Sequence, residues 1–267
     1  MDDVSDYYAS GVELERLTAG GSRIEFERTK DLLERHLPSP PASVLDVGGG
    51  PGAYAAWLAE RGYDVRLIDP VPIHVEEATR RAESSPQTFM ADLGDARQLD
   101  AADASFDIVL LMGPLYHLVE RRDRLQALAE ARRVLRDGGR VIGTAISRFA
   151  SLLDGLRQGH LSDPRFEAIV EGDLLDGLHR NPTGELDYFT TSFFHHPDEL
   201  REEIAEAGLE LEGVFGVEGP GWLLWELWDQ PDGRANILRV ARDVEREPAM
   251  LGASAHLLAV GRRSDSS

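Results

Sequence analysis

The most informative residues form a glycine-rich segment, Gly48-Gly49-Gly50-Pro51-Gly52, between an apolar run and a helical pattern. Glycines at such a junction let the chain turn sharply and let the backbone approach a ligand closely. The positive end of the following helix then faces that ligand. Asp69 ends the next apolar run, 21 residues after Gly48, and a carboxylate at this spacing suits the two hydroxyls of a ribose. The pattern therefore predicts a site for a nucleotide-like cofactor.

The same segment leaves two other interpretations open. Continued to Ala53, it also fits the fingerprint of a nicotinamide dinucleotide site with alanine in the last position. It also fits a turn between a strand and a helix that binds nothing. Three features speak against the dinucleotide. A helical pattern precedes the first strand, and Gly94-Asp95-Ala96 places a carboxylate where it could meet an adenine amino group. The strand pattern also continues past the fifth strand to a sixth and a final one.

Alternating strands and helices must position these residues. Short apolar strands are predicted at 43–47, 65–69, 88–91, 107–112, 140–146, 209–217 and 255–261. Helices are predicted at 23–37, 53–60, 73–83, 125–135 and from Pro197 onward. Gly138-Gly139 is expected to end the fourth of these helices. Continuous apolar strands that alternate with helices predict a parallel sheet covered on both faces.

Composition limits the classes of function. The chain has 267 residues, a formal net charge of −20 and no cysteine. A surface this acidic repels phosphate backbones, so no nucleic-acid partner is expected. No metal site is expected either, because thiolates are absent and no carboxylate–histidine spacing completes a site around His195-His196. Without an apolar run of 18 residues or a signal sequence, a cytoplasmic protein that does not enter the membrane is expected.

Four segments are expected along the chain. Residues 1–37 form a leader and a helix, and residues 38–146 form the cofactor-binding core. The strand–helix rhythm breaks near residue 150, which indicates an inserted helical lobe at 147–195 that shapes a substrate pocket. Residues 196–263 continue the sheet and carry a tryptophan-rich insert at 219–252.

The ordered motifs resemble those of the class I S-adenosylmethionine-dependent methyltransferases, in particular the branch with ubiquinone-biosynthesis-type and small-metabolite enzymes. The matching pieces are 44–52, 67–69, 94–96, 105–109 and 133–139, in the family's order and spacing. The resemblance implies an α/β, Rossmann-like, seven-stranded sheet. It implies that this sheet is mostly parallel with the last strand antiparallel and has helices on both faces.

By this resemblance the cofactor is S-adenosylmethionine and the product S-adenosylhomocysteine. The glycine loop lies along the methionine and ribose, Asp69 takes the ribose hydroxyls, and Asp95 with Ala96 frames the adenine. Arg28 is expected to pair with the cofactor's carboxylate, since arginine suits a bidentate contact; the alternative is an exposed helix arginine. The expected cofactor contacts are Asp46, Gly48, Gly49, Gly50, Gly52, Asp69, Pro70, Asp95, Ala96, Met112, Gly113, Arg28 and Tyr7.

Four residues are candidates for the chemistry of transfer. Tyr116 and His117 follow the fourth strand, at the edge of the sheet where ligands bind. A histidine there suits removal of a proton from an acceptor. Tyr8, beside Tyr7, is expected to belong to a lid, and His195 to face the substrate cavity. Each of the four also fits a plain packing or surface role.

The expected function is transfer of a methyl group to a small-molecule acceptor, at carbon, nitrogen or oxygen. A nicotinamide-dependent oxidoreductase and a non-catalytic cofactor-binding module are the alternatives. The sequence predicts no oligomeric state.

Overall fold

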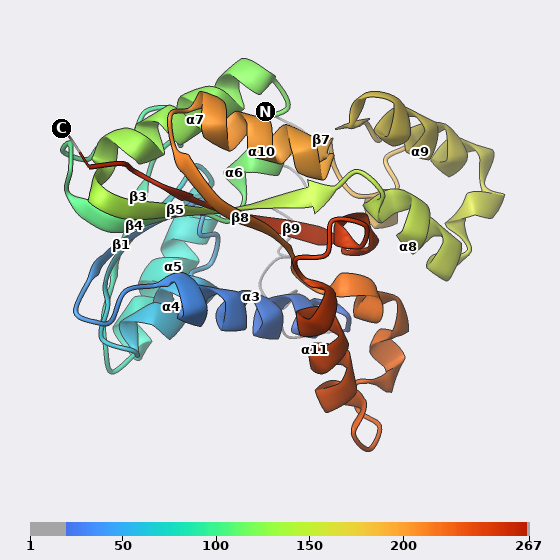
Figure 1. Ribbon diagram of the computed structural model, residues 1–267, viewed down its shortest axis with the longest axis horizontal. Helices are drawn as coiled ribbons and strands as arrows, with labels where there is room; N and C mark the ends of the chain where they lie inside the picture. The colour runs from blue at the N-terminus through green and yellow to red at the C-terminus, as the bar shows by residue number, and fades with distance from the viewer. Residues whose placement is uncertain (1–19, 266–267) are drawn as a thin grey trace. The chain divides into compact units, whose positions relative to one another are not determined.

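A computed structural model describes residues 20–265 of the chain (Figure 1). Its strands are β1 Ser43–Val47, β2 Asp64–Asp69, β3 Met90–Leu93, β4 Phe106–Leu111, β5 Leu135–Ser147, β6 Leu178–His179, β7 Ser192–His195, β8 Glu210–Gly216 and β9 His256–Arg262. Its α-helices are α3 Ser22–His36, α4 Ala53–Ala59, α5 Pro72–Ser84, α6 Pro114–His117, α7 Arg121–Val134, α8 Ala150–Gln158, α9 Pro164–Asp176, α10 Pro197–Glu206 and α11 Gly233–Val244. Short 3-10 helices are η1 His160–Ser162, η2 Leu186–Tyr188, η3 Gly219–Leu227 and η4 Leu251–Ala253.

The described strands form one mixed sheet. Strands β3, β2, β1, β4 and β5 lie side by side in that order and are parallel. Strand β9 pairs with both β5 and β8. It runs antiparallel to β5, because Arg263 bonds to Gly138 and Gly139 near one end while Ala255 bonds to Ser147 at the other. The predicted α/β sheet, mostly parallel with its last strand antiparallel, is confirmed.

The predicted strand count of seven is wrong, because β6 and β7 bring the described strands to nine. Strand β7 adds to the end of β5, where Ile146 and Ser147 pair in parallel with Phe194 and His195. Strand β6, only two residues long, pairs antiparallel with β7. A strand this short leaves no periodic pattern in the sequence, so only its tertiary pairing reveals it.

Hydrophobic residues explain how the sheet is covered. Strand β1 buries Val44, Leu45 and Val47 on both of its faces, as parallel strands between helical layers do. Helix α7 buries Ala127, Leu128, Ala131 and Val134, which form one stripe at helical spacing. Figure 1 shows α4 and α5 on one side of the parallel strands and α7 on the other.

The end of α7 differs from the prediction. The helix stops at Val134 and β5 begins at the next residue, so Gly138 and Gly139 lie inside the strand. Gly138 has a φ of +75° there. The two glycines therefore mark an irregular start of β5 and not a helix end.

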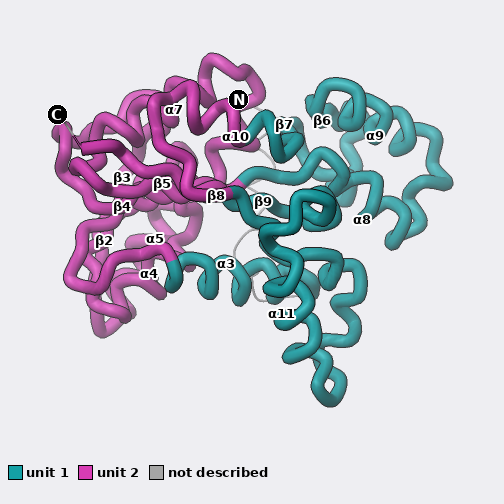
Figure 2. Tube along the Cα trace, viewed as in Figure 1, with its two compact units in different colours: residues 1–35, 145–200, 214–258 teal, residues 36–144, 201–213, 259–267 magenta. Residues whose placement is uncertain are grey.

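The chain divides into two compact units, each assembled from separate stretches (Figure 2). Unit 1 comprises residues 1–35, 145–200 and 214–258, and unit 2 comprises residues 36–144, 201–213 and 259–267. The expected segments, by contrast, were continuous. Within unit 1, helices α8 and α9 enclose a small core of their own around Phe166, Ile169, Val170 and Tyr188. Within residues 20–265, none of the helices has the length and hydrophobicity needed to span a bilayer.

Candidate cofactor site

The glycine-rich loop of unit 2 connects β1 to α4. Gly48 and Gly50 have φ angles of +70° and +54°, a region that favours glycine over other residues. A Cβ atom at Gly48 would lie 2.7 Å from the Cδ atom of Pro114, whereas one at Gly50 would meet no atom within 4 Å. The loop is therefore packed tightly against the start of α6 at Gly48 and is open at Gly50. An open backbone of this kind can receive a ligand at close range.

Asp69, at the end of β2, is tied to this loop. Its side chain is 4% exposed, and its Oδ2 accepts a hydrogen bond from the backbone N–H of Gly50 at 2.9 Å. Its Oδ1 accepts from the backbone N–H of Val71 at 2.9 Å and lies 3.1 Å from Nδ1 of His74. The expected carboxylate thus lies beside the expected glycine loop, and these bonds hold both in place.

Asp46, on β1, is a buried carboxylate whose two oxygens have no hydrogen-bond partner among residues 20–265. Burial, together with the negative charge of Asp69, raises its pKa to about 7. A Cβ atom at Gly49 would collide with it, at 2.6 Å from Oδ2. Buried carboxylates without partners are costly, so this one calls for a cation or a hydrogen-bond donor from a ligand. S-adenosylmethionine, with its ammonium and sulfonium groups, fits that demand.

Asp95 and Ala96 follow β3, and Asp95 is engaged locally. Arg97 donates to both carboxylate oxygens of Asp95, and its Nη2 lies 2.6 Å from Oδ2. This guanidinium holds the pKa of Asp95 below its ordinary value. Ala96 is buried, whereas Pro70, after β2, is exposed. An adenine amino group would therefore share the Asp95 carboxylate with Arg97.

The residues after β4 lie against the glycine loop. A Cβ atom at Gly113 would be 3.4 Å from the carbonyl oxygen of Gly48, and 3.8 Å from the hydroxyl of Tyr116. The Tyr116 hydroxyl donates to the carbonyl oxygen of Met112 at 3.0 Å. The rings of Tyr116 and His117 lie with their centroids 4.5 Å apart. The structure thus brings Met112, Gly113, Tyr116 and His117 together at one end of β4.

Arg28 has other partners. Its guanidinium is 1% exposed, and it donates to the carbonyl oxygen of Val217 at 3.0 Å and to Glu245 at 2.6 Å. It also pairs with Asp31, one turn along α3. All these residues belong to unit 1. The expected alternative of an exposed arginine is wrong, and the buried ion pairs argue against a free contact with the cofactor's carboxylate.

Of the three remaining site residues expected from the sequence, the structure describes one. His195, on β7 in unit 1, is fully buried with its ring against that of Phe193, and its role toward a substrate stays a prediction. Tyr7 and Tyr8 lie outside the described residues.

Sequence reasoning missed His74. This buried residue lies on the first turn of α5, where its ring faces the carboxylate of Asp69. The signal was present in the sequence, since a histidine five residues after the strand-ending aspartate falls on the helix turn that begins beside it.

Known proteins share this architecture. A methyltransferase-domain family model matches residues 44–139. The chain is 33% identical to the methyltransferase GfsG of Streptomyces halstedii over 62% of this chain, and it spans only 55% of that relative. It is 30% identical to a ubiquinone biosynthesis O-methyltransferase of Cereibacter sphaeroides, covering 77% of this chain and 74% of that protein.

A solved structure gives the same result for the fold. An S-adenosylmethionine-dependent methyltransferase from Methanosarcina mazei superposes with a TM-score of 0.60 at 19% identity, over 88% of this chain and 98% of that one. These relationships agree with the glycine loop, the Asp69 carboxylate and the strand order described above. The chain belongs to the S-adenosylmethionine-dependent methyltransferases, and S-adenosylmethionine is its cofactor.

Proposed function

We propose that this chain transfers a methyl group from S-adenosylmethionine to a small-molecule acceptor. The observation that carries the proposal is the convergence in unit 2 of an open glycine backbone at Gly50, the Asp69 carboxylate bonded to it, and the unpartnered carboxylate of Asp46. One relative is named for ubiquinone biosynthesis, which is small-molecule chemistry.

The residues divide the work of binding. The carboxylate of Asp69 accepts hydrogen bonds from the ribose hydroxyls. It does so with the oxygen lone pairs that Gly50, Val71 and His74 do not occupy. Asp46 faces positive charge on the ligand, which favours its ionised form. When bound, the cofactor supplies a methyl group on a positively charged sulfur atom. The chain's own contribution is therefore alignment of the acceptor and exclusion of water.

His117 is the residue we propose for removal of a proton from the acceptor. It lies at the end of α6, near Gly113, which in turn lies near Gly48 of the glycine loop, and histidine is suited to this role near neutral pH. Tyr116 positions the turn instead, because its hydroxyl already donates to Met112. A carbon acceptor that ionises easily would not need this base, so dependence on His117 also reports on the acceptor atom.

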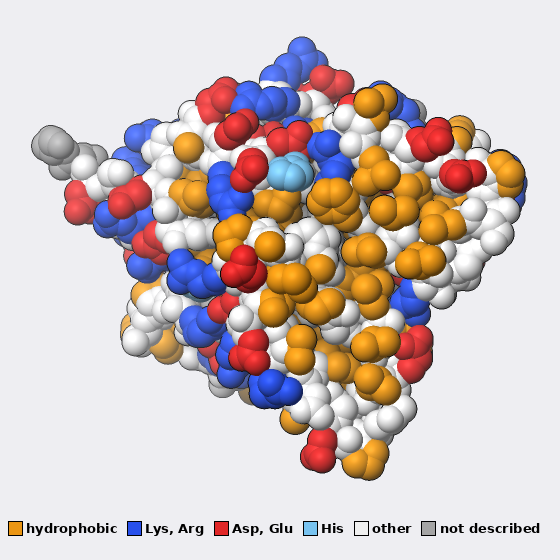
Figure 3. Space-filling view, turned by 45° about the vertical axis from the view of Figure 1, so that its right-hand side comes forward, with side chains coloured by type: hydrophobic (Ala, Val, Ile, Leu, Met, Phe, Trp, Pro, Cys, Tyr) orange, Lys and Arg blue, Asp and Glu red, His pale blue; other side chains and the backbone are white. Residues whose placement is uncertain are grey.

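Unit 1, taken by itself, exposes several leucines. Leu156, on α8, is 70% exposed, and Leu224 and Leu227 are exposed on η3, which packs against α8. Figure 3 shows hydrophobic side chains gathered over much of the face that carries these helices. Gathered apolar surface is typical of binding sites, so unit 1 is suited to bind an apolar molecule.

Two experiments test the proposal. Calorimetry should show binding of S-adenosylhomocysteine and none of NAD(H) or NADP(H); the reverse result would exclude a methyltransferase. The chain, with methyl-labelled S-adenosylmethionine, is then incubated with organic-solvent and aqueous fractions of a cell extract. Mass spectrometry should detect a product in which a labelled methyl group has replaced one hydrogen, and predominantly from the organic fraction. Label only in the aqueous fraction would contradict the apolar acceptor while leaving the activity intact.

A further inference from the structure

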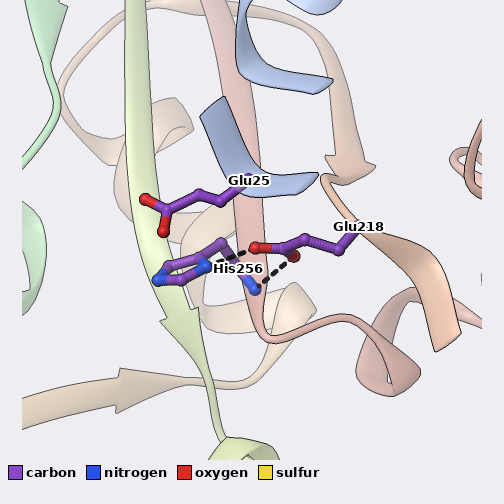
Figure 4. Close-up of side chains that lie close together, drawn as sticks. All are labelled: Glu25, Glu218 and His256. Carbon is purple, nitrogen blue, oxygen red and sulfur yellow. Dashed lines mark hydrogen bonds and ion pairs between the residues drawn. The ribbon is translucent and has the colours of Figure 1, made fainter. Parts of the chain in front are cut away.

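A group of metal-binding side chains lies in unit 1, apart from the residues assigned above. Glu25 comes from α3, Glu218 follows β8 and His256 begins β9 (Figure 4). One potential ligand atom from each lies within 4.8 Å of those of the other two. Figure 4 shows the Glu25 carboxylate over the imidazole of His256, with the Glu218 carboxylate beside one edge of that ring. Three separate elements thus direct acidic and imidazole groups to one point.

Glu218 is the second observation that points to a cation. Its side chain is 2% exposed, and its charged partner within residues 20–265 is the imidazole of His256, not an arginine or a lysine. It accepts hydrogen bonds from the Ser254 hydroxyl at 2.7 Å and from the His256 backbone N–H at 3.0 Å, and it lies 2.5 Å from Nδ1 of His256. Buried carboxylates in proteins are paired with cations or bind metals.

We propose that Glu25, Glu218 and His256 bind one divalent transition-metal ion of the Zn²⁺ class. Two carboxylates and an imidazole form a mixed oxygen and nitrogen set, which suits Zn²⁺ better than Mg²⁺. With metal–ligand bonds of about 2.1 Å, ligand atoms lie roughly 3 to 4 Å apart, so the most widely separated atoms must approach by less than about 2 Å. The contact between Nδ1 and Glu218 must open by about 0.5 Å or more for both atoms to bind the ion.

The ion would join the N-terminal part of α3 to the end of β8 and the start of β9. These positions, 25, 218 and 256, are far apart in the sequence. The expectation of no metal rested on the absence of cysteine and of a local carboxylate–histidine spacing, and neither criterion detects ligands this far apart. Three protein ligands leave a coordination position open for water or another molecule.

Titration calorimetry on the full chain, after removal of metals with EDTA, tests the site. Zn²⁺ is added in the presence of excess Mg²⁺, which occupies weak all-carboxylate sites on this acidic surface. One equivalent of Zn²⁺ should bind, and Glu25→Gln and His256→Gln should each lower the affinity at least about tenfold. The control is His196→Gln, because His196 is 46% exposed with a carboxylate, Asp198, 3.6 Å away. It should change nothing.

Equal Zn²⁺ affinity in the parent chain and in Glu25→Gln would overturn the proposal. So would a comparable loss in His196→Gln, which would indicate an adventitious surface site. Circular dichroism identifies any variant that fails to fold, and the half-buried Glu25 is the safer position if His256→Gln does. S-adenosylhomocysteine binding, measured on the same samples, keeps failure of the metal site separate from failure of the proposed function.

Discussion

Asp46 has a pKa that makes stability depend on pH. Burial raises this pKa from 3.8 to about 7, so the folded chain holds the proton more tightly than the unfolded chain. The stability that the protonated form contributes is therefore lost as pH rises from about 4 to 7. Asp46→Asn should be the more stable protein above pH 7, by on the order of a few kcal/mol, since each pKa unit corresponds to about 1.4 kcal/mol.

Urea unfolding of both proteins between pH 4 and 8 measures this difference, which should shrink as pH falls. Asp64→Asn is the control, because Asp64 begins β2 and is exposed. A stability difference independent of pH would show that Asp46 does not titrate in this range.

Asp69→Ala should weaken S-adenosylhomocysteine binding by about tenfold to a hundredfold. Charge-assisted hydrogen bonds contribute roughly 1.5–3 kcal/mol, which converts to that range. Calorimetry measures the affinity, and Asp64→Ala on the same strand should leave it unchanged. Thermal melting must accompany the measurement, because Asp69 also holds the backbone of Gly50 and Val71. Unaltered affinity in a folded Asp69→Ala protein would remove this residue from the ribose contact.

Some of these residues could be identified from sequence and others could not. Gly50 and Asp69 stand at strand ends, and parallel strands deliver their carboxyl ends to one edge of the sheet. The partners of Arg28 could not be inferred, since Glu245 and Val217 meet it from positions about two hundred residues away. Local periodicity carries no information on such contacts.

At the scale of elements, the loop between β1 and α4 depends on Gly50. Gly50→Ala should reduce cofactor affinity at least about tenfold, because the added methyl group projects into the open space proposed for the ligand. The left-handed backbone adds a stability cost of roughly 1–2 kcal/mol. Gly159→Ala is a matched control, since Gly159 also has a positive φ, of +81°, and equally open surroundings. Equal effects on binding in both variants would show that strain alone is responsible.

An ion pair joins helix α3 to the end of helix α11. Arg28 of α3 binds Glu245, the residue that follows α11. Arg28→Ala leaves the 7%-exposed carboxylate of Glu245 with one arginine, Arg35, in place of two. Removing one partner of a buried pair costs roughly 3–5 kcal/mol, so stability in urea should fall by up to that amount. Cofactor affinity of the folded variant should stay near that of the parent chain. A selective loss of affinity without loss of stability would restore Arg28 to the cofactor site.

The elements themselves were largely predictable. Strand β1 occupies the predicted residues, and α3, α4 and α5 differ from prediction by about one residue at their ends. Apolar periodicity and the stops at proline and glycine carry that information. Strand β6 was not predictable, because its two residues are defined only by pairing with β7.

At the scale of the whole molecule, every described cofactor contact that we propose lies in unit 2. S-adenosylhomocysteine alone should therefore slow amide hydrogen exchange at 46–52, 69–74 and 112–117. Exchange in α8 and η3 of unit 1 should stay unchanged, because no cofactor contact is proposed there. Mass spectrometry of peptic fragments measures the exchange of the unit 1 and unit 2 segments separately. Protection of α8 by S-adenosylhomocysteine alone would contradict this division.

The discontinuity of the two units also bears on how the chain is made. A ribosome releases the chain from its N-terminus, yet unit 1 needs residues up to 258 and unit 2 needs β9. Until β9 emerges, β8 lacks its neighbour and the outer edge of β5 stays open along much of its length. Nascent chains therefore carry an unpaired strand edge late into synthesis, when such edges are prone to aggregate. A chaperone that binds nascent chains should accordingly raise the yield of native protein more than it does for a fold completed from its N-terminus.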